Sequence, residues 1–300
     1  MRRFYFLLIL FFGCSESQEP TPKKTVFEDS KLVFVVDDVL WKNYIDRLVN
    51  QTFEANIEGL SSPEPMFLVL QTNKKGLKET LKNNKNILGI IFISELITAK
   101  KTMNWDANFF SIELRWEKES QAFLKELIRT RDLFILKELK ETTNYFSKKS
   151  KNEIEKDILS NFGFSCIIPE KYTIIKNTDS LFLASYDPPG SDEIKNILIF
   201  SFESKNKNIN KEVLLKTDSV FGKYFIGEEK GSRVRIDPNH VPYINKNNYR
   251  GIWRLENGWM GGVFVIKTRY LKGRVVVSSG MVFSPNTSKR KHIKEFEAIL

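Results

Sequence analysis

Strand-like and helix-like runs alternate in the first half of the chain. Buried strands are predicted where short apolar runs are bounded by polar residues, over 31–36, 66–70, 86–93 and 109–114. Helices are predicted where apolar residues recur at helical spacing, over 39–53, 75–83 and 117–148. This alternation predicts an α/β layer with some parallel pairing over residues 30–148.

The pattern changes after Gly163 to short β-prone runs split by turn residues. Strands are predicted over 164–168, 172–176, 181–186, 197–203, 249–255, 260–271 and 274–283, and helices over 213–225 and 289–300. Asn257-Gly258 is a strong hairpin signal between two of these strands. Strand runs flanked by helices predict an antiparallel sheet with helices packed on one face. The expected fold class is therefore α+β, with an N-terminal α/β layer followed by that sheet.

The first residues have the pattern of a lipoprotein signal peptide. Two arginines precede an apolar run over 4–12, which is too short to span a bilayer. Gly13 and Cys14 then form a lipobox arrangement, in which the Cys14 thiol carries the lipid after cleavage. The alternative is an uncleaved anchor or an ordinary start with a buried cysteine. Residues 14–29 are rich in Ser, Glu, Pro, Thr and Lys, and such a composition predicts a flexible tether.

These patterns divide the chain into five regions. They are a signal peptide over 1–13, a tether over 14–29, an α/β module over 30–148, a helical connector over 149–162, and an antiparallel α+β module over 163–300.

Several short motifs follow one another in a defined order along nearly the whole chain. They are the lipobox with 32–41, then 58–60 with 65–67, then 250–253 with 260–264, and finally 280–285 with 289–290 and 295–300. Together they resemble the Bacteroidota lipoproteins of the domain of unknown function 4837 family. That family usually shows proline after the paired glycines, where this chain has Val263. The resemblance implies a cell-envelope lipoprotein without an assigned activity, and it supplies no catalytic residues.

Composition and charge narrow the function classes. The chain has 47 Lys and Arg against 37 Asp and Glu, a net charge of +10, and 41% hydrophobic residues, which excludes collagen-like and wholly disordered chains. The basic excess favours anionic lipid or glycan partners, and the alternative is a lysine-rich bias on an ordinary surface. One face carrying Lys289, Arg290 and Lys294 is expected to lie against anionic lipid. No nucleic-acid recognition motif occurs, so nucleic acid is not an expected partner.

Two cysteines and two histidines leave little for a metal or cofactor. They form neither a disulfide framework nor a cysteine-based zinc site, and no Walker A run or GxGxxG occurs, so no cofactor and no metal are expected. Cys166 is expected to be a buried small apolar residue. His292 is expected at a solvated helix start. His240 lies near Asp237 in a turn, and no activated nucleophile is expected beside it.

An acidic pair is the best-placed polar feature of the first half. Asp37 and Asp38 follow a predicted strand, and ligands bind beyond the carboxyl ends of strands in open α/β sheets. The alternative is that one of them caps the helix that begins near Val39.

A paired glycine is the second candidate. Gly261 and Gly262 lie near Trp253 and Trp259, so a ligand resting on bare backbone between aromatic rings is one interpretation. The alternative is a bent hairpin that packs its aromatic residues into the core.

The expected function is a non-catalytic binding or assembly module of the cell envelope, anchored by lipidated Cys14. We expect it on the outer membrane, facing the periplasm, with the membrane and another envelope protein as partners. The alternative is an envelope hydrolase that uses Asp37 or Asp38.

Overall fold

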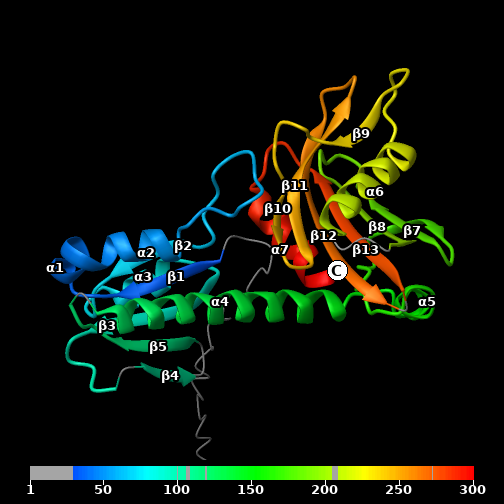
Figure 1. The fold of residues 1–300 in the computed structure, drawn as a ribbon. Coiled ribbons are helices and arrows are strands. Elements are labelled where there is room, and N and C mark those ends of the chain that lie inside the picture. The colour runs from blue at the N-terminus through cyan, green and yellow to red at the C-terminus, as the bar shows by residue number, and fades with distance from the viewer. Residues whose placement is uncertain (1–29, 100, 106–108, 119, 205–208, 272) are drawn as a thin grey trace, which may run out of the picture.

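Two β-sheets and a long helix make up the protein. The computed structural model describes residues 30–99, 101–105, 109–118, 120–204, 209–271 and 273–300. Helix α4 (Gln121–Ser147) runs beside the first sheet and on to the second, and helix α7 (Lys289–Ile299) lies where the two parts meet (Figure 1). The signal peptide, the tether and Cys14 lie outside the described residues.

The first sheet has the order β2-β1-β3-β5-β4. Its strands are β1 (Lys31–Val35), β2 (Leu68–Thr72), β3 (Ile87–Ser94), β4 (Lys101–Trp105) and β5 (Phe110–Arg115). All pairs are parallel except β4 with β5, so the expected α/β layer is confirmed. The sequence did not predict β4, because this edge strand is polar and has no apolar run.

Helices cover both faces of this sheet. They are α1 (Asp38–Leu40), the π-helix η1 (Trp41–Ile45), α2 (Asp46–Thr52) and α3 (Leu77–Asn83). Leu32 and Phe34 of β1 share a core with α2 and α4, while Val33 and Val35 share one with α3. The helix expected over 39–53 is therefore present, with a π-helical turn in its first half.

The second sheet is antiparallel, in the order β10-β11-β12-β13-β8-β7-β6, with β9 beside β11. Its strands are β6 (Thr173–Asn177), β7 (Leu181–Tyr186), β8 (Ile194–Glu203), β9 (Arg233–Ile236), β10 (Tyr243–Asn245), β11 (Asn248–Glu256), β12 (Gly261–Leu271) and β13 (Arg274–Phe283). The α+β fold class is confirmed. The strand expected over 164–168 is wrong, because these alternately buried residues form a loop that packs against the C-terminal helix.

The second sheet is covered on both faces, where the sequence predicted helices on one. Helices α5 (Asn152–Phe162) and α7 pack on the face that carries Phe182 and Ala184. Helix α6 (Ile209–Tyr224) packs on the face that carries Leu181 and Leu183. Strand β13 shows the physical reason. Every residue after Arg274 is buried, so both faces of this strand must pack against other elements.

A charged network joins α7 to the first sheet. The Arg290 guanidinium lies 3.4 Å from Glu138 of α4 and donates to the Met66 carbonyl at 2.7 Å. Lys294 also contacts Glu138, and burial lowers the pKa of this lysine to about 8. Glu64 accepts from the backbone N–H groups of Lys289 and Arg290, both at 2.8 Å, at the start of α7.

This network corrects one expectation. Arg290 is 2% exposed, and the ammonium of Lys294 reaches the buried Glu138. Lys289, Arg290 and Lys294 therefore do not form one exposed basic face, because Arg290 is buried and both Arg290 and Lys294 pair with Glu138. None of the helices in the described part of the chain is long and apolar enough to cross a bilayer.

Candidate functional site

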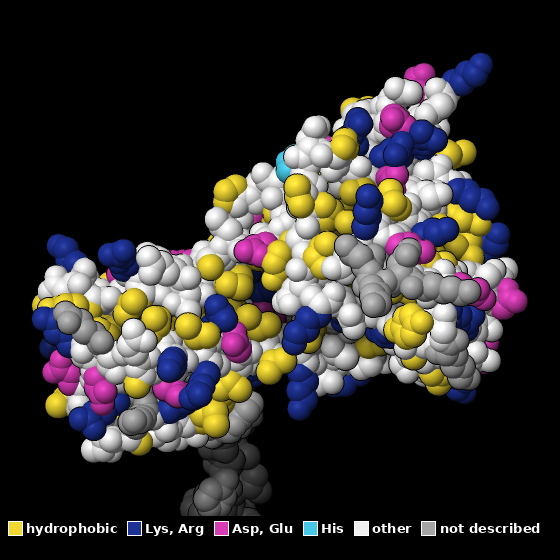
Figure 2. All heavy atoms as spheres, viewed as in Figure 1, with side chains coloured by type: hydrophobic (Ala, Val, Ile, Leu, Met, Phe, Trp, Pro, Cys, Tyr) yellow, Lys and Arg dark blue, Asp and Glu magenta, His cyan; other side chains and the backbone are white. Residues whose placement is uncertain are grey.

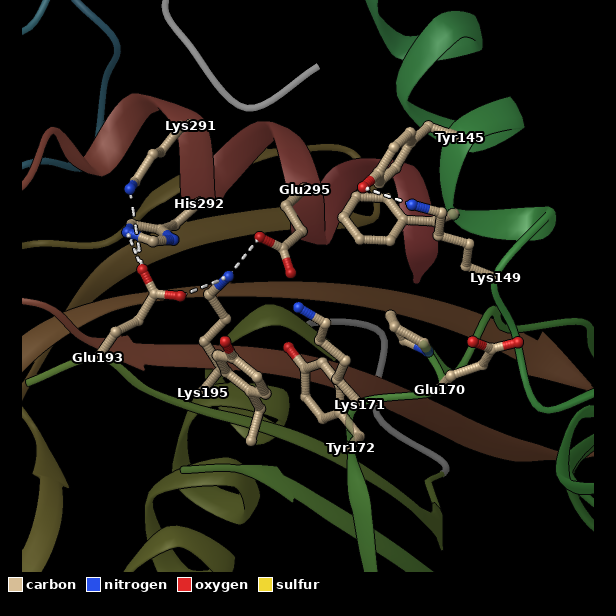
Figure 3. Close-up of a pocket in the computed structure, with 13 residues that line it drawn as sticks. Tyr145, Lys149, Glu170, Lys171, Tyr172, Glu193, Lys195, Lys291, His292 and Glu295 are labelled. Carbon is tan, nitrogen blue, oxygen red and sulfur yellow. Dashed lines mark hydrogen bonds and ion pairs between the residues drawn. The ribbon is translucent and has the colours of Figure 1, made fainter. Parts of the chain in front are cut away.

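A pocket of about 310 Å³ lies beside α7, and we call it the α7 pocket. Its walls come from four segments far apart in the chain: the end of α4 with residues 145–149, the loop over 169–172, the strand ends around Tyr186 and 193–195, and α7 over 291–295. Figure 3 shows charged, aromatic and imidazole side chains from these segments pointing toward one space.

A lysine between two carboxylates forms one side of the pocket. Lys195 is 7% exposed, and its Nζ lies 2.7 Å from Glu295 Oε2 and 2.9 Å from Glu193 Oε1. Burial alone would lower the pKa of Lys195, but the two carboxylates outweigh burial and raise it. Burial raises the pKa of Glu295, and Lys195 opposes that shift. The ammonium charge is therefore fully compensated inside the protein.

His292 is buried in the pocket wall, although a solvated helix start was expected. Its ring is on the inward face of α7, next to the core residue Ile293. Its Nε2 lies 3.2 Å from Thr287 Oγ1 and 3.5 Å from Glu193 Oε2. Burial, assisted by nearby lysines, lowers the pKa of His292 to about 2, so the ring is neutral.

The other ring nitrogen of His292 is unpartnered among the described residues. Nδ1 is buried and makes no hydrogen bond within the described chain. With the single proton on Nε2, facing the Glu193 carboxylate, Nδ1 presents a lone pair and is an acceptor.

Tyr172 supplies a matching unpaired donor. Its side chain is 3% exposed, and its hydroxyl has no hydrogen-bond partner in the part of the chain that the structure describes. Burial, followed by the carboxylates of Glu295 and Glu193, raises the pKa of Tyr172 well above its usual range, so the hydroxyl keeps its proton. The Tyr172 and Tyr186 ring centroids lie 5.8 Å apart, which gives the pocket an aromatic wall.

The acidic pair of the first half lies away from this pocket. Asp37 accepts from the backbone N–H groups of Val39 at 3.0 Å and Leu40 at 3.4 Å, which is helix capping. Asp38 accepts from side-chain amides of Gln71 and Asn73, both at 3.0 Å. Neither residue is among those that line the α7 pocket.

The glycine pair and the two tryptophans have different surroundings in the structure. Trp253 is buried, and its indole donates to the Val282 carbonyl at 3.2 Å. A Cβ on Gly262 would lie 1.9 Å from the same oxygen, so this glycine permits close packing of β12 on β13. A Cβ on Gly261 would lie 3.1 Å from the Trp253 carbonyl. Trp259 is 81% exposed and touches only the edge of this region, against Phe283.

The remaining chemical candidates lie outside the pocket. His240 Nδ1 is 2.7 Å from Asp237 Oδ2 in a surface turn. Cys166 is buried, as expected, and burial raises the pKa of its thiol to about 12. Within the described residues, no group of three or more His, Cys, Asp and Glu side chains is placed to hold a metal ion.

Two charged residues at inward positions are a signal for the pocket that the sequence contains and that our sequence prediction did not use. Lys195 alternates with the buried Ile197 and Ile199 on one face of β8. Glu295 sits between Ile293 and Phe296 on the buried face of α7. Charged residues at inward positions of apolar elements are seldom buried without a partner. The pattern marks both residues, but it does not show that they meet.

His292 makes stability depend on pH. Its pKa is about 2 in the folded protein and about 6.5 unfolded, so between these values the unfolded chain binds more protons and stability falls as pH falls. We expect His292→Gln to flatten the fall between about pH 6.5 and 4.5, by up to about 1.4 kcal/mol per pH unit. Urea unfolding at several pH values measures this.

The control for this pH effect is His240→Gln, because the His240 side chain is 44% exposed. The groups that face the His292 ring, Glu193, Lys195, Lys289 and Lys291, are unchanged in both variants. Parallel pH profiles for the wild type and His292→Gln would contradict the assignment.

A family model described as "Domain of unknown function (DUF4837)" matches residues 150–300, which is 151 of 300 residues. A second, described as "Domain of unknown function (DUF8532)", matches residues 28–112. No curated protein matches the chain.

Among solved structures, the chain is similar to the human StarD13 (DLC2) lipid transfer and protein localization domain. The identity is 10% and the TM-score 0.19, over 47% of this chain and 90% of that one. A similarity of this size supports no conclusion about fold or function. The family match over 150–300 includes every residue of the α7 pocket except those at the end of α4.

Proposed function

The chain belongs to the domain of unknown function 4837 family, and from that premise we propose that it is a lipid-anchored, non-catalytic binding module of the cell envelope. In this proposal Cys14 carries the anchor, and the α7 pocket holds a small ligand. The protein sits on the outer membrane and faces the periplasm. The short apolar run before Gly13-Cys14 supports the anchor.

The observation that carries the binding role is the unfinished hydrogen bonding of the pocket. A buried donor on Tyr172 and a buried acceptor on His292 are both unpartnered among the described residues, whereas buried polar groups are normally satisfied. A ligand that bonds to both would recover the free energy that their desolvation costs.

Basic surface charge contributes little to this proposal. Figure 2 shows Lys and Arg side chains scattered over this face of both parts of the protein, with acidic and apolar side chains between them. The membrane contact therefore depends on the acyl chains at Cys14, since several acyl chains hold a protein stably on a bilayer.

Replacing Cys14 tests the anchor. We expect the wild type to incorporate a palmitate analogue in cells and Cys14→Ala to incorporate almost none, because the Cys14 thiol is the attachment point. The measurement is in-gel detection of the analogue. Cys166→Ala is the matched control and should label like the wild type, since the Cys166 thiol is buried. Equal labelling of wild type and Cys14→Ala would contradict the anchor.

Closing the pocket mouth tests the binding role. Lys149 lines the α7 pocket and Lys148 does not, and both are exposed. In saturation-transfer NMR of the full chain in detergent with a chemically diverse fragment set, we expect wild type and Lys148→Trp to bind some fragments. Lys149→Trp should bind the same fragments at least about tenfold more weakly, because the indole fills the mouth. A set with no bound fragment, or equal binding by the two variants, would contradict the pocket's role.

A further inference from the structure

We propose that the α7 pocket takes one uncharged, polyhydroxylated ring, a pyranoside sugar unit, which bonds to the Tyr172 hydroxyl and to His292 Nδ1. This inference rests on the binding role proposed above and names the chemical class of its ligand. Three features of the pocket support it: complementary hydrogen-bonding atoms without partners among the described residues, paired charges at the buried wall, and two aromatic side chains.

The unpaired atoms call for a ligand that both donates and accepts. Tyr172 offers an O–H donor and His292 Nδ1 offers an acceptor, and both side chains are at least nine-tenths buried. A sugar hydroxyl donates and accepts with the same oxygen, so one ring with several hydroxyls meets both requirements. A purely apolar ligand would leave both atoms unsatisfied.

The charge balance favours a neutral ligand. Lys195 is already bonded to Glu193 and Glu295, and Lys291 lies 3.8 Å from Glu193. At this buried wall, an anionic or cationic ligand would have to break one of these pairs or bring an uncompensated charge into a buried site, and both cost free energy. The other charged lining residues, Lys149, Glu170 and Lys171, are exposed to solvent, which screens their charges. Glu and Lys side chains that are held in place also accept from, and donate to, uncharged hydroxyls.

The aromatic wall and the size fit a single ring. Tyr172 and Tyr186 both line the pocket, with ring centroids 5.8 Å apart at an interplanar angle of 34°, and aromatic side chains give apolar contact to the C–H groups of a pyranose. A volume of about 310 Å³ is at the small end for ligand sites, so the pocket accommodates one ring rather than an extended chain.

Ligand entry requires a rearrangement of side chains. The Tyr172 hydroxyl and His292 Nδ1 are covered by neighbouring atoms in the ligand-free protein. Lys149 and Lys171 line the same pocket and are exposed, and long exposed lysine side chains change rotamer within nanoseconds. In this proposal the two lysine side chains move aside as the ligand enters.

Calorimetric titration of the full chain, in a detergent without a sugar headgroup, tests the proposal. The neutral probes are the methyl pyranosides of glucose, mannose, galactose and N-acetylglucosamine, and the charged probes are glucuronate and glucosamine. We expect at least one neutral probe to saturate in the millimolar range, at least about tenfold more tightly than either charged probe.

Tyr172→Phe connects the binding to the proposed atom. We expect it to weaken binding of the neutral probe at least about tenfold, because a site built to bond a hydroxyl loses strongly when one partner is removed. The melting temperature should stay unchanged or rise, since the lost hydroxyl has no hydrogen-bond partner among the residues that the structure describes. Tyr270→Phe, at a residue that is 63% exposed, is the control and should bind like the wild type.

Three outcomes would overturn the proposal. These are no saturation by any neutral probe up to about 50 mM, tighter binding of a charged probe, or an unchanged affinity in Tyr172→Phe. If the diverse fragments still bind in a Lys149-dependent way, the sugar class is wrong and the binding role stands. If the fragments also fail, both are wrong.

Discussion

Glu138→Gln is expected to lower the free energy of unfolding by about 3–5 kcal/mol, because it removes the carboxylate that pairs with the buried Arg290 and the partly buried Lys294. Glu138 is 8% exposed, lies 3.4 Å from Arg290 and is also bonded to Lys294. Glutamine keeps the shape of the side chain and removes the charge. Urea denaturation followed by circular dichroism measures the loss.

A second glutamate on the same helix provides the control. Glu141 forms an i,i+4 ion pair with Lys137, and its side chain is 32% exposed. Glu141→Gln should cost no more than about 0.5 kcal/mol, which is typical of helix-surface pairs. Similar losses in the two variants would mean that the network around Glu138 does not join the two parts of the protein in the way the structure indicates.

The Glu138 variant should also respond to pH in a defined direction. Lys294 has a pKa of about 8 in the folded protein against 10.5 unfolded, so above about pH 8 the unfolded chain binds more protons and stability rises with pH. Glu138 raises the pKa of Lys294. In Glu138→Gln, the pH range over which stability rises with pH therefore begins at a lower pH. Part of the stability lost by Glu138→Gln should therefore return between about pH 7 and 10.

Apolar periodicity predicted the long strands well, because these strands are buried on at least one face. The run over 274–283 is buried from Val275 to Phe283, and its β-branched residues specify a strand without help from distant contacts. Strands β4, β9 and β10 were not predicted, because short strands at the edge of a sheet depend on a neighbour for their pairing. The segment over 164–168 was wrongly predicted as a strand. Its apolar residues pack in the core beside α7, but its backbone does not pair with any strand of the described sheets.

The α7 pocket was not predictable from the sequence, because periodicity shows which face of an element is buried but not which elements meet. Lys195 and Glu295 are 100 positions apart and become partners only when α7 packs on the second sheet. The basic residues beside His292 predict that its side chain is exposed to solvent, which is wrong. Those neighbours are themselves partly buried, and Arg290 serves the interface with the first sheet.

The glycine pair was predictable from the sequence as a site of bent backbone or close backbone approach. Replacing Gly262 is the second substitution with a large expected effect on stability. Gly262→Ala is expected to lower the free energy of unfolding by about 2–4 kcal/mol, from overpacking and from an orphaned indole N–H. The new methyl group would lie 1.9 Å from the Val282 carbonyl oxygen, which is backbone and can move only with β13. The Trp253 indole, which donates to that oxygen at 3.2 Å, would lose its acceptor.

The near-ultraviolet circular dichroism of tryptophan reports this change together with the stability loss, since Trp253 is buried and held by one hydrogen bond. Gly222→Ala in α6 is the matched control. Its new Cβ would come no closer than 3.4 Å to the Arg233 side chain, and alanine is favoured over glycine in a helix by up to about 1 kcal/mol. We therefore expect opposite signs for the two substitutions. A tolerated Gly262→Ala would show that β12 and β13 do not approach each other as closely as the structure indicates at this position.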